Sequence, residues 1–526
     1  MYHPSQTSQI IQKAFRNTMT RTQTSDGITY HAIGHGHIDP VWLWRWQEGY
    51  EEIRATFRSA LDRMKETPDV CFIASSAAFY KWALEIDPTM FKEIQGRVRE
   101  GRWNIVGGWI VEPDCNVPGG ESFVRHGLYG QRFFRKHFGI TVTEGFNPDT
   151  FGHAGTLPQI LKKSGFSTYT YMRPAPDIEM KYQYLHFWWE ARDGSRILGG
   201  CIPICYDVLP EKLEERFRAL QIGPYRHPNQ RDEMFFFGIG NHGGGPTKKC
   251  IRIILDLQSD QDSPPIRFSH LTRYYHCLTE TLSTESLPVV QTDLQHHARG
   301  CYTSHSEVKR LNRRCEHALM QAERWSAVGT VLQNLPIERE QIQDAWETVL
   351  FHQFHDILAG TSIEAAYQDV RNAYGSVLWT ADKIRNRVIQ EIAKRIDTSG
   401  EGRSIIVFNP LPWPVSAPVR VPSSVKRFLG RTLGILDDSG QEIPSQEIVG
   451  QQVGNTDLLF LADVPGLGYR TYRAVPLLNT PRKQESNRTL RIESGLLEND
   501  YWRISVDQHS GEIVSLFDKK NGVETL

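Results

Sequence analysis

Apolar and polar positions along this chain follow three different patterns in succession. In the first, between about Ile28 and Leu294, short apolar runs alternate with helix-like stretches such as Pro88 to Gly101 and Glu121 to Gly139. Strands that alternate with helices are typical of an α/β layer or barrel with a largely parallel sheet. We therefore predict an α/β domain over residues 28–295.

The second pattern is helical. Lys309 to Gln333, Glu338 to Phe354 and Glu364 to Ile396 hold apolar residues at three- and four-residue spacing, with no strand-like alternation. Three antiparallel helices are the simple solution, so residues 296–398 are predicted to form a three-helix bundle. His355 falls at the end of the second of these helices.

The third pattern follows the linker Thr398 to Arg403 and consists of alternating strands with Pro and Gly turns. Tyr501 to Val506, Glu512 to Phe517 and the turn at Lys520 to Gly522 are typical of a hairpin series. Residues 402–526 are therefore predicted to begin a β-sandwich. The predicted fold class is multidomain, with an α/β, an all-α and an all-β part in that order.

Composition narrows the classes of protein to consider. The chain has 526 residues with 39% hydrophobic content, and no apolar run approaches the ~20 residues of a membrane span. A formal charge of −1, from 60 basic and 61 acidic residues, provides no field for nucleic acid or an anionic bilayer. The polar arm at residues 1–27 lacks the apolar stretch of a secretory signal, which predicts a cytoplasmic protein. The eight scattered cysteines indicate reduced thiols rather than a disulfide scaffold.

Candidate chemistry begins at the end of the first apolar strand, in Ile33-Gly-His-Gly-His-Ile-Asp-Pro40. Positions i and i+2 of a strand share a face, so His37 and Asp39 point the same way. Imidazole nitrogen and carboxylate oxygen are ordinary ligands of Zn²⁺. The structural alternative is a histidine at a strand end that only satisfies hydrogen bonds.

Three further segments place polar groups at the ends of predicted elements. Asp149 lies at the C-terminal end of a strand, where α/β enzymes hold their chemistry; the alternative is a carboxylate that begins a turn or caps the next helix. Phe235 to Pro246 is an apolar strand running into a glycine-dense loop, which permits close backbone approach to a ligand or makes only a flexible turn. His355 and Asp356 offer a third ligand and carboxylate.

At these residues the chain resembles the glycoside hydrolase family 38 α-mannosidases. The resemblance implies that His37, Asp39, Asp149 and His355 bind one Zn²⁺ per chain. Co²⁺ and Ca²⁺ are the runner-up metals, because mixed His and carboxylate ligation does not select Zn²⁺ uniquely. The segments that carry the resemblance fall in the family's order: Gly34 to Pro40, Trp109 to Ser122, Pro148 to His153, Phe187 to Ser195, His297 to Ser304, and Gln353 to Thr361.

For the fold, the resemblance implies a seven-stranded, barrel-like catalytic domain whose metal site is completed by His355 from the helical bundle. For the chemistry, it implies a retaining α-mannosidase that hydrolyses α-linked mannose in oligosaccharides. Asp149 would be the nucleophile, about 5 Å from an acid, and Zn²⁺ would hold the sugar 2- and 3-hydroxyls. Family members continue through more β-structure, so we expect residues 402–526 to be truncated.

The proton donor is where the chain departs from the family. Many relatives have an Asp in the loop before the glycine run, whereas this chain has Asn241, and an amide cannot act as an acid. His242 could serve instead, since imidazolium titrates near neutrality. Asp114 or Asp356 could also be the acid, and they are favoured on carboxylate chemistry alone. In the remaining alternative, the loop binds substrate only.

Other side chains are expected to bind the sugar or to orient a ligand. Large flat tryptophan rings suit stacking on a pyranose, and the structural alternative is that they are core residues. Arg299 and Tyr302 lie in a segment that resembles a family substrate-site strand, and the structural alternative for them is a buried ion pair and a packed ring. Glu112 is the candidate partner that orients a metal-binding histidine. The predicted substrate-binding residues are Trp42, Trp109, Asn241, Arg299 and Tyr302.

Two other functions stay open at this point. A metal-dependent carbohydrate deacetylase also uses Asp and His ligands, and Asp149 would then be a base or a ligand. Asn241 and the expected truncation favour the other alternative, a pseudoenzyme that binds mannose without turnover. The predicted partner is an α-mannoside oligosaccharide, with no nucleic acid and no membrane; the oligomeric state stays open, a homo-oligomer included.

Overall fold

The computed structural model describes residues 27–174, 184–223, 225–295, 298–422, 433–449, 456–476 and 490–526. The predicted polar arm at residues 1–27 therefore falls, except for Gly27, outside the described residues. The chain divides into two compact units, residues 1–391 and 392–526.

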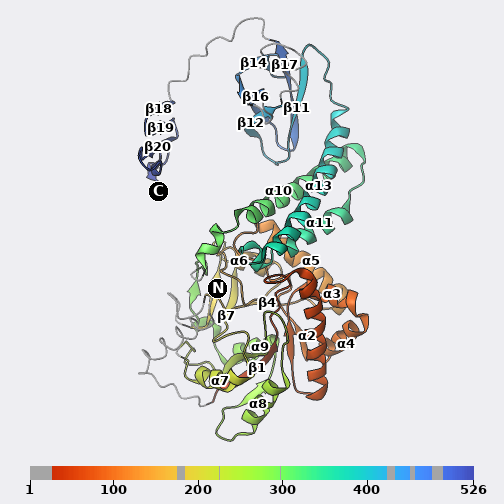
Figure 1. The fold of residues 1–526 in the computed structure, drawn as a ribbon, viewed down its shortest axis with the longest axis vertical. Helices are drawn as coiled ribbons and strands as arrows, with labels where there is room; N and C mark the ends of the chain where they lie inside the picture. Colours follow the sequence, from red (N-terminus) through yellow and green to blue (C-terminus); the bar gives the residue numbers. More distant parts are fainter. Residues whose placement is uncertain are drawn as a thin grey trace. The chain divides into compact units, whose positions relative to one another are not determined.

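The described strands of the first unit form two five-stranded sheets (Figure 1). In the first sheet all pairings are parallel, in the order β3-β2-β1-β8, and β9 also pairs with β1. In the second, the order is β10-β6-β7-β5-β4, and β6 and β7 are antiparallel. The strands are β1 (Thr29–His35), β2 (Phe72–Ala74), β3 (Trp103–Ile105), β4 (Glu144–Asn147), β5 (Thr168–Tyr171), β6 (His186–Glu190), β7 (Arg196–Cys201), β8 (Asp232–Phe237), β9 (Ile266–Phe268) and β10 (Val289–Val290).

The α/β character agrees with the sequence, but the expected seven-stranded barrel is not confirmed. Two features of the described strands account for the two separate sheets. β2 and β3 are only three residues long, so their ladders end early, and the antiparallel pairing of β6 with β7 interrupts the parallel order. The sheets approach each other where the Gly107 N–H, just after β3, donates to the carbonyl of Glu144, the first residue of β4, at 2.8 Å.

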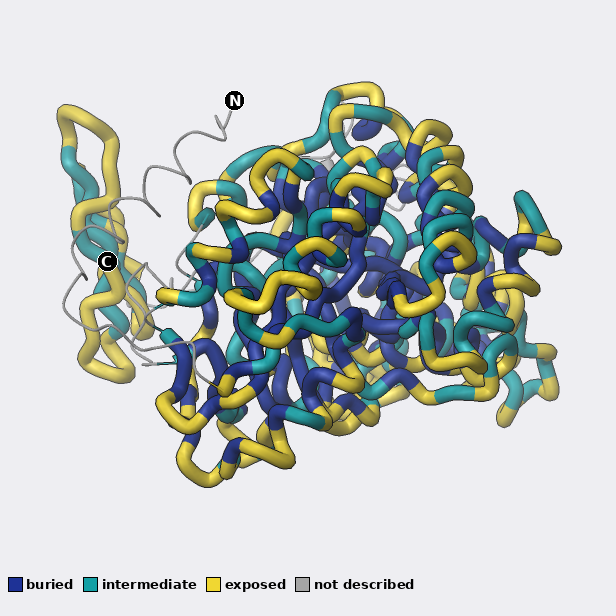
Figure 2. Tube along the Cα trace, turned by 90° about the horizontal axis from the view of Figure 1, so that it is seen from below, coloured by how far each residue is buried: buried dark blue, intermediate teal, exposed yellow. Residues whose placement is uncertain are grey.

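Helices connect these strands, and both helix-like stretches of the sequence are helical. α4 begins with Pro88, and the Asp87 side chain caps it by accepting hydrogen bonds from two backbone N–H groups. α5 ends at Phe138, and the next residue, Gly139, caps it with a φ of 72°, a left-handed conformation that favours glycine. Figure 2 shows buried positions gathered in the interior beneath partly exposed outer turns. The helices are α2 (Trp46–Glu66), α3 (Ala77–Ile86), α4 (Pro88–Arg99), α5 (Gly120–Phe138), α6 (Leu157–Lys163), α7 (Leu213–Gln221), α8 (Lys248–Ser259) and α9 (Leu271–Thr281).

The helical region has the three long helices that the periodicity predicts: α10 (Ser306–Gln333), α11 (Arg339–Phe351) and α13 (Glu364–Ala393). The second helix is shorter than expected, however, and His355 does not end it. A turn follows Phe351, and His355 begins the short helix α12 (His355–Leu358). Within the described ranges, no helix combines the length and the apolar character that a bilayer crossing requires.

The reason for this break lies in main-chain pairing with a distant segment. The Asp114 N–H donates to the Gln353 carbonyl at 2.9 Å, and the His355 N–H donates to the Glu112 carbonyl at 3.3 Å. Pro113 and Phe354 form a β-bridge between these two hydrogen bonds. Gln353 and Phe354 are therefore held against residues 112–114, and α11 cannot continue through them.

The second unit consists of antiparallel strands, as the alternation predicts. Two of its sheets share one apolar core, which includes Phe460 and Val464 from one sheet and Ile435 and Tyr472 from the other. Their strands are β11 (Arg403–Asn409), β12 (Val415–Val421), β13 (Leu433–Leu436), β14 (Glu442–Ile443), β15 (Ser445–Val449), β16 (Thr456–Val464) and β17 (Gly468–Pro476). A third sheet runs in sequence order through β18 (Arg491–Glu493), β19 (Leu496–Glu498), β20 (Trp502–Val506), β21 (Ile513–Asp518) and β22 (Val523–Glu524).

Candidate metal centre

The structure brings the four predicted metal ligands together. His37 and Asp39 follow β1, Asp149 follows β4, and His355 begins α12. All four residues are buried, and one ligand atom from each lies within 4.8 Å of the ligand atoms of the others. Three segments far apart in the sequence thus supply two imidazoles and two carboxylates to one point at the carboxyl ends of parallel strands.

Three of the four distances within this cluster are too long for direct hydrogen bonds and suit a shared divalent cation. His37 Nε2 lies 2.9 Å from Asp39 Oδ1 and 4.0 Å from Asp149 Oδ2. His355 Nε2 lies 3.8 Å from Asp39 Oδ1 and 3.9 Å from Asp149 Oδ2. Among the described side chains, neither Nε2 atom nor Asp39 Oδ1 finds a partner in hydrogen-bond geometry. Buried polar atoms are seldom left in that state, and nitrogen and oxygen donors of this kind fit Zn²⁺.

Glu112 orients both histidines of the cluster. Its Oε2 lies 3.2 Å from His37 Nδ1, and its backbone carbonyl accepts a hydrogen bond of 3.0 Å from His355 Nδ1. Its other carboxylate oxygen accepts a hydrogen bond from the Ser75 hydroxyl. Burial acts to raise the pKa of Glu112, but the His37 imidazole outweighs it and the pKa is lowered. The hydrogen bond occupies Nδ1 of His355, and Glu112 faces Nδ1 of His37 as an ion pair, so in each ring Nε2 is the atom directed at the other ligands.

Asp149 has a second partner that the sequence reasoning missed. Arg173 Nη2 lies 2.7 Å from Asp149 Oδ1. Burial acts to raise the pKa of Asp149, but Arg173 and then His37 outweigh it, so the pKa is lowered and the carboxylate is ionised. His153 Nε2 donates to the Arg173 carbonyl at 2.7 Å and Tyr169 donates to its Nδ1, so the histidine of the Asp149 motif fixes Arg173.

Tyr206 is the other site residue that sequence reasoning missed. Its ring centroid lies 4.8 Å from that of His37, and its hydroxyl donates to Asn241 Oδ1 at 2.8 Å. Arg173 comes shortly after β5, which neighbours β4 in the second sheet, and Tyr206 comes shortly after β7, which neighbours β5. The rule that active residues follow the carboxyl ends of strands could have indicated both.

The glycine-dense loop packs tightly against the strand end that carries the ligands. A Cβ on Gly238, which has a φ of 134°, would lie 1.9 Å from the His35 carbonyl oxygen. The Asn241 carbonyl accepts a hydrogen bond of 2.9 Å from the Asp39 N–H. Asn241 itself has a φ of 65°, a left-handed conformation in which Asn is enriched. The close approach is therefore to the chain's own backbone.

The two carboxylic acid candidates occupy different environments. Asp114 Oδ1 accepts backbone hydrogen bonds from Asn116 and Val117 at 2.9 and 2.7 Å, although burial raises its pKa overall. Asp356 Oδ2 lies 3.8 Å from His355 Nε2, and burial, followed by the charge of Asp39, raises the pKa of Asp356 well above its usual value. Asp356 thus adjoins the ligand cluster, whereas Asp114 holds a turn.

His242 lies at the exposed side of the loop. Half of its side chain is exposed, and Nε2 lies 2.6 Å from Glu48 Oε1 on α2. Its ring stands edge-on to Trp44 with the ring centroids 4.6 Å apart. The Gly244 N–H donates to Thr56 on the same helix, so α2 holds the outer part of the loop at two points.

The other predicted sugar-binding residues are spread over different surroundings. Trp42 is half-buried, and its ring stands edge-on to Trp44. Trp109 is 2% exposed and packs against Phe123 and His126, as a core ring does. The segment with Arg299 and Tyr302 forms a 3-10 helix rather than a strand, and the Tyr302 hydroxyl accepts a hydrogen bond from Asn116 at 2.8 Å.

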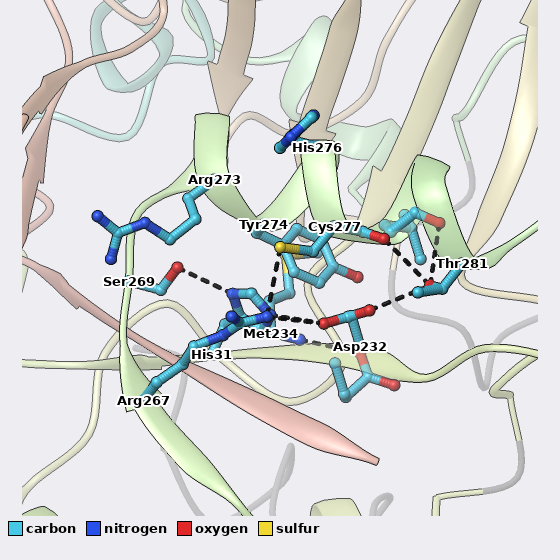
Figure 3. A network of polar contacts seen from close by, with 12 residues as sticks. His31, Asp232, Met234, Arg267, Ser269, Arg273, Tyr274, His276, Cys277 and Thr281 are labelled. Carbon is cyan, nitrogen blue, oxygen red and sulfur yellow. Dashed lines mark hydrogen bonds and ion pairs between the residues drawn. The ribbon is translucent and has the colours of Figure 1, made fainter. Parts of the chain in front are cut away.

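A second cluster of metal-ligating side chains already contains a cation (Figure 3). His31, Asp232 and Cys277 converge as three ligands could, but Arg267 Nη2 lies between them, at 2.9, 3.1 and 3.3 Å from Nε2, Oδ1 and Sγ respectively. Ser269 Oγ fixes the other imidazole nitrogen of His31 at 2.8 Å. The guanidinium therefore fills the position a metal would need, and this network joins β1, β8 and α9.

Comparison with known proteins gives a consistent result. The family model "Glycosyl hydrolases family 38 N-terminal domain" matches residues 27–297, and "Alpha mannosidase middle domain" matches residues 296–392. Alpha-mannosidase G of Dictyostelium discoideum is 28% identical over 459 residues, covering 83% of this chain and 42% of the relative. Human alpha-mannosidase 2C1 is 30% identical over 401 residues, covering 73% and 37%. The chain thus spans less than half of the length of these relatives.

A solved structure shares the fold. The crystal structure of an alpha-mannosidase from Enterococcus faecalis superposes with a TM-score of 0.73 at 17% identity, covering 94% of this chain and 61% of that one. At that identity the likeness concerns the fold alone.

Zn²⁺ is expected to stabilise the protein against unfolding through the first cluster. At free Zn²⁺ of 100 times Kd, the free energy of unfolding should rise by about 2.7 kcal/mol, seen in calorimetry as a higher Tm that chelator reverses. Asp39→Asn should remove most of this shift. Asp232→Asn is the matched control in the Arg267 network and should lower the Tm of metal-free protein while retaining the response to Zn²⁺. If Asp232→Asn loses the Tm increase with Zn²⁺ and Asp39→Asn keeps it, the metal binds at the Arg267 network and not at the four predicted ligands.

Proposed function

Because the chain belongs to glycosyl hydrolase family 38, we propose that it is a metal-dependent, retaining α-mannosidase that removes α-linked mannose from oligosaccharides. The observation that carries the proposal is the buried group of His37, Asp39, Asp149 and His355, in which the ionised Asp149 also pairs with Arg173. The names of the relatives favour mannoside hydrolysis over deacetylation.

The proposed cofactor is one Zn²⁺, with Co²⁺ and Ca²⁺ as the alternatives that the same donors allow. When bound, the ion would supply Lewis-acid and electrostatic support and hold the 2- and 3-hydroxyls of mannose. The protein's own contribution is to exclude water from the four ligands and to fix both imidazoles through Glu112. These contacts leave the ligand atoms prepared for a metal before it binds.

Asp149 is the proposed nucleophile. A retaining mechanism needs an ionised carboxylate at the sugar carbon and a separate acid at the leaving oxygen. Arg173 keeps Asp149 ionised and engages Oδ1, while Oδ2 faces the two histidines. The two oxygens of the nucleophile are therefore held in different, fixed environments, which orients the carboxylate for attack.

For the proton donor we propose Asp356 or His242, ahead of Asp114. Asp114 Oδ1 accepts hydrogen bonds from the backbone N–H groups of Asn116 and Val117, which commits that carboxylate to a turn. Asp356 adjoins the ligand cluster, and His242 lies beside Asn241 at the exposed side of the loop. Asn241, held by Tyr206, would hydrogen-bond to substrate.

The wider setting is also part of the proposal. We propose the division into a catalytic α/β domain at residues 28–295, a bundle at 296–398 that completes the metal site, and a β-region from residue 402. The cytoplasmic location, the lack of nucleic-acid and membrane partners, and a homo-oligomeric state as one option rest on composition and stay predictions. A mannose-binding protein without turnover is the second candidate function, and the observation that favours it is Asn241.

Release of nitrophenol from 4-nitrophenyl α-D-mannoside tests the proposal. Chelated protein should be inactive, Zn²⁺ should restore activity, and Asp149→Ala should lower kcat/KM by roughly 10³-fold or more, because the nucleophile is gone. Asp193→Ala, a matched change at an exposed turn, should retain full activity. Absence of turnover in folded, Zn²⁺-loaded protein that still binds mannose would favour the non-catalytic candidate.

Leaving-group dependence tests the proton donor. Nitrophenolate leaves without protonation, whereas the alkoxide of a sugar does not, so loss of the acid should slow a mannobiose by about 10²- to 10⁴-fold and the nitrophenyl substrate far less. We expect that pattern for Asp356→Asn or His242→Ala. Asn241→Asp, which the left-handed backbone tolerates, should change either rate by less than about 10-fold. A large gain on mannobiose alone in Asn241→Asp would show instead that the natural chain lacks its acid.

A further inference from the structure

Gln353 is a buried residue of the turn between α11 and α12, two positions before His355. Its side-chain NH₂ group donates to Ser122 Oγ at 3.0 Å, to Asn312 Oδ1 at 2.9 Å and to Glu316 Oε1 at 3.1 Å. These three acceptors share the two hydrogens of the amide. Its Oε1 accepts a hydrogen bond of 3.1 Å from His126 Nε2. Gln353 is fully buried, so solvent provides no replacement for these contacts.

The partners of Gln353 belong to two other helices. Ser122 and His126 lie on α5, and Asn312 and Glu316 lie on α10. Glu316, which is 1% exposed, also accepts hydrogen bonds from the Ser122 hydroxyl at 2.6 Å and the Gly119 N–H at 2.8 Å. The amide of Gln353 therefore ties the turn to the start of α5 and to the middle of α10 at the same time.

The backbone of the same residue faces the metal centre. The Gln353 carbonyl accepts the hydrogen bond from Asp114, and the next two residues pair with Pro113 and Glu112. Glu112 in turn contacts both candidate metal-binding histidines. A shift of the Gln353 side chain would thus be transmitted through one residue of backbone to His355 and to the carboxylate that orients His37.

An amide is the group that this environment requires. Glu316 Oε1 accepts a hydrogen bond from the Gln353 side chain, and the neutral imidazole of His126, whose pKa burial lowers to about 3, donates its N–H to it. Glutamine supplies both the donor and the acceptor in one planar group. A glutamate of the same shape would place a second carboxylate about 3 Å from Glu316, and like charges at this distance in a buried site repel strongly.

We propose that Gln353 is a positioning residue that sets the metal affinity of the centre by holding the turn that delivers His355. This inference rests on the proposed metal site, since it concerns how tightly that site binds. Partners that orient metal ligands typically change affinity by 10- to 100-fold when they are lost. We expect Gln353→Glu to raise the Zn²⁺ dissociation constant by that factor.

The test compares Gln353→Glu with Gln131→Glu in the full chain. Gln131 is also a buried glutamine, on α5, but its amide binds the backbone of Val142 and touches neither the turn nor Glu112. Zn²⁺ affinity is measured by competition with a chromophoric chelator, and the visible spectrum of the Co²⁺-loaded protein reports the ligand geometry. Thermal unfolding of metal-free protein gives the structural effect. Gln131→Glu should lower Tm with no change in affinity or spectrum, whereas Gln353→Glu should change both.

Wild-type affinity and an unchanged Co²⁺ spectrum in folded Gln353→Glu would overturn the inference. If the wild-type protein itself binds no metal, the proposed metal site is wrong, and the inference about Gln353 is rejected together with it. That result differs from a wild-type protein that binds metal and a Gln353→Glu variant that binds it equally well. Should Gln353→Glu not fold, Ser122→Ala removes one hydrogen-bond partner without adding charge. It should raise the dissociation constant several-fold, and an unchanged constant there would also overturn the inference.

Discussion

The structure around the candidate site depends on the burial of two carboxylates and two imidazoles in one place. Desolvating charged groups is costly unless partners compensate for the lost water, and Asp39 and Asp149 are both buried near the same histidines. Arg173 offsets part of this cost at Asp149, and Glu112 fixes the ring of His37 from the far side. A cation among the four donor atoms would offset the remainder, which couples metal binding to the stability of the fold.

The same contacts hold the helical region against the α/β part of the first unit. A regular α11 would satisfy the His355 N–H with a carbonyl four residues earlier; instead that N–H donates to Glu112. The chain exchanges a helical hydrogen bond for a long-range one and thereby directs His355 toward Asp39 and Asp149. The position of the turn before α12 and the assembly of the ligands therefore both depend on one β-like pairing between residues 112–114 and 353–355.

What the sequence could reveal follows from the range of the interactions involved. The ligand pair His37 and Asp39 could be predicted, because side chains two residues apart in an extended chain point to the same side. The long helices could be predicted from the periodicity of their apolar residues. Arg173 could not be assigned to Asp149 without the order of β4 and β5 in the sheet. The role of Gln353 depends on partners 37 and 231 residues away, and the break in α11 depends on Glu112. Because β2 and β3 are so short, the pattern of apolar residues in the sequence could not distinguish a closed barrel from two separate sheets.

The loop that carries Asn241 limits which residues can take part in proton transfer. Asn241 has its carbonyl bound to the Asp39 N–H and its side-chain oxygen bound to Tyr206, so its amide is fixed beside His37. A group in that position can donate an N–H to a sugar oxygen, but it has no proton to give up at any pH near neutrality. In the proposed mechanism, binding and proton transfer, which a single carboxylic acid there could combine, are therefore divided between two residues. This division explains why the surroundings of the proposed nucleophile can be deduced from the contacts of Asp149, whereas the proposed acid has to be identified by leaving-group dependence.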